Sequence, residues 1–290
     1  MHSKTTSWVL LVLLSLVWGS SFILMKRGMD AFSSSEVAAM RISMAFLVLF
    51  PVFVRHFKPE FKSRIVPLML TGVFGNLIPA FLFTLAETRI NSGLAGMLNA
   101  LTPVFTMLLS IFWLRIRVSR HQILGLAGGL LAACGLMVFE PGHNKYQNIS
   151  YGLLVILATV CYAISVNVIK KYLGKLSAIG TTAWAFTITG PLAMTYLFGF
   201  SHFTSTLISH PQALSALAYT AILAVVGSAL SVIAYNYLIK HAGTVFASSC
   251  TYLIPVVAIF WGYFDGESVN FYQILCVLVI IFSVYLVNKD

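Results

Sequence analysis

Ten stretches of mostly apolar residues alternate with short polar connections along the chain. Each is about 17 to 27 residues long, and about 20 apolar residues let a helix cross the hydrocarbon layer of a bilayer. The pattern therefore predicts an all-α integral membrane protein with ten transmembrane helices. The predicted spans are Trp8–Met25, Val37–Val54, Ile65–Leu85, Ser92–Leu114, Ile123–Phe139, Tyr151–Ile169, Ala178–Gly199, Ala213–Ile239, Thr244–Phe264 and Phe271–Val287.

The fourth and ninth stretches share a small and polar face. Steps of three and four residues place Ser92, Gly96, Asn99, Pro103, Thr106 and Ser110 on one side of a helix. The pattern returns 152 residues later, at Thr244, Ser248, Thr251, Pro255, Ala258 and Gly262. Each proline frees the carbonyl four residues before it, which a membrane tolerates only against protein or a watery cavity. The two faces are interpreted either as helix–helix contacts or as the lining of a cavity, with bends at Pro103 and Pro255.

The composition agrees with a membrane protein. The chain is 59% hydrophobic and 9% charged, whereas soluble proteins are about 25% charged. The net charge of +10 does not indicate a nucleic-acid partner, because the cations lie at the ends of the predicted helices. The four cysteines all lie in apolar stretches without the spacing of metal ligands. No disulfide framework, metal or other cofactor is therefore expected.

The distribution of Lys and Arg predicts the orientation. Counted in alternate connections, 13 fall on the side of both termini and four on the other, while Arg41 lies within the second stretch. Because cytoplasmic loops are rich in Lys and Arg, both termini are expected on the cytoplasmic side of the membrane. The membrane expected is a bacterial-type inner membrane. The larger group is Lys4, Arg55, Lys58, Lys62, Arg64, Arg115, Arg117, Arg120, Lys170, Lys171, Lys175, Lys240 and Lys289, and the smaller is Lys26, Arg27, Arg89 and Lys145.

The chain also repeats itself. A shift of 144 residues places Trp18 on Tyr162, and a shift of 152 places Phe83 on Tyr235. Each half contains five predicted helices, an odd number, so the second half must enter the membrane from the opposite side. We therefore expect two inverted five-helix repeats, residues 1–143 and 144–290, around a central cavity, an arrangement common in secondary transporters.

Polar and aromatic residues at membrane depth gather on the first, third, fourth, sixth, eighth and ninth helices, while the fifth and tenth have almost none. For single serines, a hydrogen bond within the same helix is an alternative explanation. The predicted cavity residues are Trp18, Ser21, Asn76, Phe83, Asn99, Tyr162, Ser165, Ser231, Tyr235, Asn236 and Thr251.

Four charged or titratable residues are candidates for a gate or an intramembrane charge. Arg41 lies inside the second helix, where it could serve function or pair with Glu36 near the membrane surface. Glu87 and Arg89 lie in the short turn between the third and fourth helices, and His241 lies in the corresponding turn of the second half. Surface charge is the alternative role for these turn residues.

Several stretches resemble the EamA-type branch of the drug/metabolite transporter superfamily. They include WGSSFILMKRG at 18–28, the arginine of AAMRISMAF at 38–46, GLAGMLNALTPVFTMLLS at 93–110 and HQILGLAGGLLAACGLMV at 121–138. The second half repeats the set in YAISVNVIKKY at 162–172, TVFASSCTYLIPVVAIFWGYFDGES at 244–268 and FYQILCVLVIIFSVYLV at 271–287. The resemblance implies ten helices in two inverted domains, a central cavity, and export of amino acids or other small metabolites. A leucine-glycine-glutamate motif of the family survives as Gly266 and Glu267 but is replaced by Leu114 and Arg115 in the first half.

These observations favour a secondary transporter that exports small metabolites such as amino acids by alternating access. No carboxylate is expected at mid-membrane depth, which favours efflux down the substrate gradient over proton exchange. The alternatives are a membrane enzyme or lipid-handling protein, or a channel, although no catalytic constellation is found and none is expected. The partners expected are the small-molecule solute and the lipid bilayer. The small-residue ridge of Gly125, Gly129 and Ala133 predicts a packing face, either within the fold or between copies as a homodimer through the fifth and tenth helices.

Overall fold

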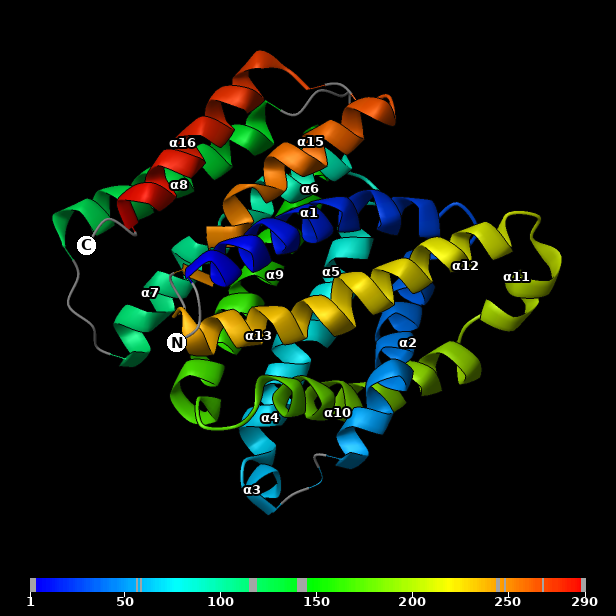
Figure 1. The fold of residues 1–290 in the computed structure, drawn as a ribbon. Helices are drawn as coiled ribbons and strands as arrows, with labels where there is room; N and C mark the ends of the chain where they lie inside the picture. Colours follow the sequence, from blue (N-terminus) through cyan, green and yellow to red (C-terminus); the bar gives the residue numbers. More distant parts are fainter. Residues whose placement is uncertain are drawn as a thin grey trace.

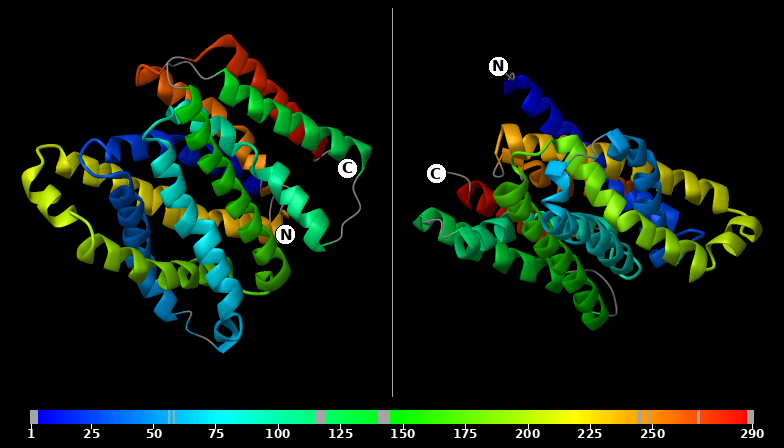
Figure 2. Two further views of the ribbon diagram at one scale, coloured as in Figure 1. Left: turned by 180° about the vertical axis from the view of Figure 1, so that it is seen from behind. Right: turned by 90° about the horizontal axis from the view of Figure 1, so that it is seen from below.

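The computed structural model describes residues 4–55, 57, 59–114, 119–139, 145–243, 246–247, 249–267 and 269–287, so Thr244 and Ser248 of the second polar face lie outside it. Within these ranges the chain is a bundle of helices without a β-strand (Figures 1 and 2). In chain order they are α1 (Lys4–Gly28), α2 (Ser34–Arg55), α3 (Pro59–Lys62), α4 (Ile65–Gly72), η1 (Val73–Leu77), α5 (Ile78–Ala86), α6 (Ser92–Asn99), α7 (Thr102–Leu114), α8 (Arg120–Val138), α9 (Lys145–Val168), η2 (Ile169–Leu173), α10 (Ala178–Gly199), α11 (Phe203–Ser209), α12 (Ala213–Ile222), η3 (Leu223–Leu230), α13 (Ser231–His241), η4 (Ser249–Tyr252), α15 (Ile254–Phe264) and α16 (Phe271–Val287).

Six helical stretches of the described chain are long and apolar enough to cross a membrane. Large apolar side chains such as Phe112, Leu131 and Phe271 stand on the outside of the bundle, largely exposed. Such a surface suits lipid and is unusual for a soluble protein. The six stretches are Thr5–Gly28, Ser34–Arg55, Ile65–Ala86, Ser92–Trp113, Ser150–Leu173 and Ala213–His241.

The two stretches with a small and polar face are interrupted near Pro103 and Pro255 rather than bent. Helix α6 ends at Asn99 and α7 begins at Thr102, so Pro103 is the second residue of a new helix. At that position a proline costs nothing, because the N–H it lacks would have no partner within the helix. The carbonyl of Asn99 instead accepts a hydrogen bond of 2.8 Å from the Thr102 hydroxyl. Pro255 occupies the same position in α15, which follows the short 3₁₀ turn η4.

Three other stretches contain widened π-helical turns, and in one of them α9 continues directly into η2. The segment α4–η1–α5 is continuous through η1, and α12–η3–α13 is continuous through η3. Gly75 lies within η1 and Gly227 within η3. A Cβ atom on Gly75 would stand 2.4 Å from the Ser165 hydroxyl, and one on Gly227 would stand 3.0 Å from the Ser21 hydroxyl. The glycines therefore let neighbouring helices approach the π turns closely.

Helices α8 and α16 lie side by side at one edge of the bundle (Figure 1). A Cβ atom on Gly128 of α8 would stand 2.7 Å from the hydroxyl of Ser283 on α16, so the glycines of α8 serve this contact within the chain. The middle of the bundle is formed by α1, which packs against α15 and α12, and by α9, which packs against α5 and α7. The fifth and tenth predicted helices, which have almost no polar residues at membrane depth, thus lie at the edge of the bundle.

Candidate functional site

A cavity lies at the centre of the bundle. Its space not filled by atoms is about 970 Å³, part of it open to the surroundings. Most of the residues predicted for the cavity line it, namely Trp18, Ser21, Asn76, Phe83, Asn99, Tyr162, Ser165, Tyr235, Asn236 and Thr251. Ser231 is not among the lining residues, and its hydroxyl donates a 2.6 Å hydrogen bond to the Val226 carbonyl of its own helical stretch. That serine therefore follows the alternative explanation of a hydrogen bond within the helix.

Two aromatic pairs stand in the cavity wall. The Trp18 ring of α1 meets the Tyr235 ring of α13 edge to face, with centroids 5.0 Å apart. The Tyr162 ring of α9 stacks on the Phe83 ring of α5 at 5.9 Å. The indole N–H of Trp18 also donates to the carbonyl of Gly227 at 3.0 Å. The rings provide flat apolar surfaces that are fixed in place by contacts between helices.

The buried amides have different roles. Asn99 places its carbonyl and its side-chain oxygen against the Thr102 hydroxyl, which secures the break between α6 and α7. The amide of Asn236 donates to Thr182 of α10 at 2.9 Å, which ties α13 to that helix. Asn76 lies in the π turn η1 and is 8% exposed. Polar groups thus line the cavity beside the rings, as in pockets that bind small amphipathic molecules.

Arg41 also lines the cavity. Its Nε donates to the Ser228 hydroxyl at 2.7 Å, and its Nη1 lies 3.8 Å from the sulfur of Met25. The predicted alternative, a pair with Glu36, is wrong. The Glu36 carboxylate instead accepts hydrogen bonds of 2.8 Å from the main-chain N–H and the hydroxyl of Ser33, which caps α2. Arg41 therefore directs its charge inward, toward η3.

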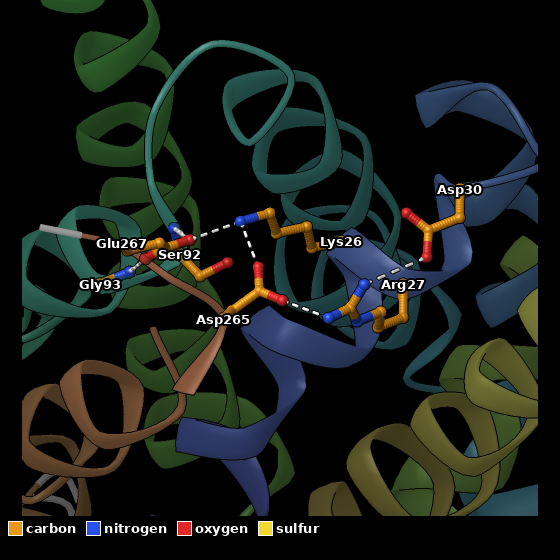
Figure 3. A network of polar contacts seen from close by, with 7 residues as sticks. All are labelled: Lys26, Arg27, Asp30, Ser92, Gly93, Asp265 and Glu267. Atoms are coloured by element: carbon orange, nitrogen blue, oxygen red, sulfur yellow. Dashed lines mark hydrogen bonds and ion pairs between the residues drawn. The ribbon is translucent and has the colours of Figure 1, made fainter. Parts of the chain in front are cut away.

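A network of ion pairs joins the end of α1 to the turn after α15 (Figure 3). Lys26 lies 2.5 Å from Asp265 and 2.9 Å from Glu267, and both acids are more than nine-tenths buried. Arg27 pairs with Asp265 and lies 3.6 Å from Asp30. The network connects residues that are more than 230 positions apart in the chain.

Glu267 also holds the start of α6. Its two carboxylate oxygens accept hydrogen bonds of 3.0 Å from the main-chain N–H groups of Ser92 and Gly93. A negative charge at a helix N-terminus is favourable because the free N–H groups and the helix dipole are positive there. One carboxylate therefore connects α1, α6 and α15 (Figure 3).

The turn between α5 and α6 has one exposed and one buried ionisable residue. Arg89 is exposed, in agreement with a surface charge, but Glu87 is 7% exposed and is therefore not a surface charge. Neither carboxyl oxygen of Glu87 has a hydrogen-bond partner among the described residues. Burial raises the pKa of the Glu87 carboxyl well above its usual range, and the negative charge of Glu267 adds to this shift. His241 is exposed, and its ring stacks on Tyr237.

The sequence interpretation missed the ion-pair network. In the predicted topology the first and ninth helices end on the same side of the membrane, so Lys26 and Arg27 lie on the side of Asp265 and Glu267. Opposite charges on one side were the available signal. It also missed Ser228 as the partner of Arg41, because the pairing depends on how α2 packs against η3.

The comparison with known proteins decides the family. A model of the EamA-like transporter family matches residues 6–138 and 149–289, which is nearly the whole chain. The chain belongs to the EamA-like transporter family. It is therefore a multi-pass transmembrane protein of a transporter family, and the resemblance seen in the sequence motifs is confirmed.

Individual relatives of this EamA protein are distant. The uncharacterized inner membrane transporter YedA of Escherichia coli K12 is 26% identical, with 95% of this chain and 88% of YedA covered. A protein of Streptantibioticus cattleyicolor named as a probable terminal-alkyne amino-acid exporter is 26% identical, covering 86% of this chain and 82% of its own. A protein of Chlamydia muridarum named as an S-adenosylmethionine/S-adenosylhomocysteine transporter is also 26% identical, with coverages of 89% and 84%.

One crystal structure shares the fold. Its TM-score is 0.68 with 14% identity, and the alignment covers 98% of this chain and 96% of the other. The likeness extends over the full helical bundle. The apolar helices and the family match together show a multi-pass membrane protein, and the relative YedA is named as an inner membrane transporter.

Proposed function

We propose that this EamA protein exports small metabolites such as amino acids across the inner membrane by alternating access. The observation that carries the proposal is the central cavity, whose wall combines residues from both halves of the chain, including the pairs Trp18–Tyr235 and Tyr162–Phe83. A site between two halves is exposed to either side of the membrane in turn when the halves rock against each other. The relatives named as an amino-acid exporter and an S-adenosylmethionine transporter support the class of solute.

The proposal includes ten spanning helices in two inverted repeats, residues 1–143 and 144–290. Two contacts between the halves support it, because each recurs with the halves exchanged. The shifts of 144 and 152 residues convert the Trp18–Tyr235 contact into the Tyr162–Phe83 contact. The same shifts convert the approach of Gly227 to Ser21 into that of Gly75 to Ser165.

The proposed orientation, with both termini in the cytoplasm, places the ion-pair network of Lys26, Arg27, Asp265 and Glu267 on the outer side. The corresponding inner positions are Lys170, Lys171, Trp113 and Arg115, which include no acid. There the ammonium of Lys171 lies 5.6 Å from the Trp113 ring centroid. Partly buried ion pairs with several hydrogen bonds hold more firmly than an exposed cation over a ring. This difference supports a resting state that is closed on the outer side.

The experiment is solute flux in proteoliposomes that contain the purified protein. Amino acids, nucleosides and cationic dyes are tested one at a time, with counterflow of labelled solute as the measurement. Alanine at Trp18, Asn99, Tyr162 or Tyr235 is expected to lower counterflow at least tenfold. Leu131→Ala is the matched control, because Leu131 is 73% exposed on the outside of α8. Unchanged flux in all four cavity variants would show that the cavity is not the transport site.

The same measurement separates the alternatives. A channel would pass solute without saturation and without stimulation by solute on the opposite side. A membrane enzyme or a lipid-handling protein would change the solute chemically or move only lipid. Saturable counterflow of an unmodified solute supports the transporter and contradicts both.

The topology has its own test. In the proposed orientation, residues 55–64 and 115–121 lie on the same, cytoplasmic side. Single cysteines introduced at Arg64 and at Arg120 should both be protected from an impermeant thiol reagent added outside right-side-out vesicles. Labelling of only one of the two would contradict the inverted repeat.

A further inference from the structure

Arg41 is held in a fixed orientation at the cavity wall. The hydroxyl of Ser228 accepts the hydrogen bond from Arg41 Nε at 2.7 Å and donates its own proton to the Leu223 carbonyl at 3.2 Å. Ser228 and Leu223 both belong to the π turn η3, in which residues five apart are brought into register. The widened turn thus fixes one edge of the guanidinium group and leaves the other edge toward the cavity.

Arg41 forms no close ion pair with an acid of the described chain. Among the described residues that line the cavity, Arg41 is the one charged side chain. Within the described residues no carboxylate oxygen lies within 4.0 Å of its nitrogens, although Lys26 and Arg27 both have such partners. The carboxyl of the buried acid Glu87 makes no hydrogen bond to Arg41.

An unpaired cation at membrane depth is costly, and proteins retain one where it pairs with something else during function. The guanidinium has five N–H donors, of which the described contacts occupy one on Nε and a weak one on Nη1. Nη2 has no described partner. Two parallel N–H groups of this kind match the two oxygens of a carboxylate, and the match is both strong and geometrically selective.

The surroundings of Arg41 in the cavity define the rest of the ligand. The rings of Trp18, Tyr162 and Tyr235 offer apolar surface, and Asn76 and Asn99 offer amides. Among the described residues that line the cavity there is no acid, so a carboxylate meets the charge of Arg41 whereas an ammonium group meets only rings and amide oxygens.

We infer that Arg41 is the binding site for the carboxylate group of the transported solute, which makes the solute a small organic carboxylate with an apolar body. The inference rests on the proposed transport function for its biological meaning. It goes further in assigning recognition to the carboxylate rather than to an amino group. Ser228 acts as a positioning residue, because it touches Arg41 and holds the guanidinium plane.

Four compounds that share one phenyl ring test the inference by binding, without any need for flux. L-Phenylalanine and 3-phenylpropionate contain a carboxylate, whereas L-phenylalaninamide and phenethylamine do not. Each is titrated into the purified protein in nanodiscs at pH 7, and the thermal unfolding midpoint is followed by tryptophan fluorescence. Both carboxylates should raise the midpoint in a saturable manner, and the other two should leave it unchanged. Failure of both carboxylates, or an equal effect of the amine, would overturn the assignment.

Variants locate the effect. Arg41→Gln should weaken carboxylate binding about tenfold or more, as expected for a lost charge-assisted hydrogen bond. Arg55→Gln is the matched control, since it removes an exposed arginine from the other end of the same helix. Ser228→Ala should weaken binding less than Arg41→Gln and leave the preference for carboxylates in place. If Arg41→Gln does not fold, Arg41→Lys retains the charge without the two-pronged geometry and should still bind more weakly than the wild type.

The outcome also separates this inference from the proposed function. Binding of carboxylates through Arg41 without counterflow of any solute would retain the site and reject the transporter. Saturable counterflow of phenethylamine with no carboxylate bound would retain the transporter and reject the site. Equal carboxylate binding by the wild type and Arg41→Gln would overturn the inference whatever the flux.

Discussion

The indole N–H of Trp18 donates a hydrogen bond to the main-chain carbonyl of Gly227, 209 positions away, at a distance of 3.0 Å. Gly227 belongs to the π turn η3, and Trp18 stands on α1 at the cavity wall. One side chain thus satisfies a carbonyl of the widened turn while its ring contacts Tyr235 on the helix that follows. Cavity shape and helix geometry therefore depend on the same residue.

Trp18→Phe should retain an aromatic ring but leave the Gly227 carbonyl without this donor. A buried carbonyl that loses its partner costs about 1–3 kcal/mol, so the thermal unfolding midpoint in detergent should fall. Trp8→Phe is the matched control, because Trp8 is 58% exposed near the start of α1 and its edge-to-face contact with the Phe246 ring is one that phenylalanine can retain. An equal loss of stability in the two variants would contradict the role given to the Gly227 contact.

Glu267→Gln should weaken the ion-pair network at the end of α1, which closes the outer side in the proposed mechanism. The variant removes the charge that pairs with Lys26 and that lies at the start of α6. A charge-assisted hydrogen bond is worth about 1.5–3 kcal/mol, so opening should become about tenfold more frequent or greater. The measurement is the labelling rate of a cysteine at Ile90, which is 4% exposed in this structure, in a background without native cysteines.

Asp30→Asn serves as its control. The Arg27–Asp30 pair is 3.6 Å long and both side chains are at least 40% exposed, and such surface pairs contribute little. The labelling rate at Ile90 should change less than about twofold. A rate in Asp30→Asn that matches that of Glu267→Gln would show that charge anywhere at this end of the bundle, and not the network, controls opening.

Glu87→Gln should change how stability depends on pH. Because burial raises the pKa of the Glu87 carboxyl, the folded protein binds this proton more tightly than the unfolded chain does. The resulting stabilisation is complete in acid and is lost as the pH rises above the unfolded value of about 4.3, by at most about 1.4 kcal/mol per pH unit. Glutamine cannot ionise, so the variant should lose less stability between pH 5 and pH 8.

The measurement is the unfolding midpoint across that pH range in nanodiscs. Glu60→Gln, at an exposed position in α3, is the control and should follow the wild type. A wild-type curve that rises with pH in this range and becomes flat in Glu87→Gln would show that the carboxyl is stabilised in its charged form instead.

Gly96→Ala should disturb the contact between the two interrupted helices. A Cβ atom at Gly96 of α6 would stand 2.4 Å from the Cβ of Ala258 on α15, which real structures do not allow. Forcing the helices apart costs about 1–3 kcal/mol, visible as a lower unfolding midpoint. At Gly199, nothing lies within 4 Å of such an atom, so Gly199→Ala should change stability by less than about 1 kcal/mol.

Much of the helical layout was predictable because long apolar runs have clear ends. The predicted stretches Ala178–Gly199 and Phe271–Val287 coincide with α10 and α16. Asn99 and Thr251 were expected at the cavity from their places beside a proline, and both line it. Such features can be predicted from the sequence, because a proline frees the carbonyl of the residue four positions before it whatever the rest of the fold.

Features that depend on distant packing were not predictable. The helix break before Pro103 needs the Thr102 hydroxyl as a substitute donor, and bend and break look alike in a sequence. Glu87 follows a helix end, where an acid is normally solvated, and only the packing of the bundle around it buries it. Ser231 was expected in the cavity, but the widened turn η3 brings its hydroxyl within hydrogen-bond distance of the Val226 carbonyl five residues before it.

The pseudo-symmetric position of Arg41 in the second half is Ala185, a buried residue of α10 without charge. In the proposed repeats the two halves therefore give the cavity similar rings, whereas Arg41 is the one cation among the described residues that line it. A transported solute with an anionic group at one end would therefore keep one orientation in the cavity throughout the transport cycle. A compound with its charge in the middle would fit poorly in either orientation.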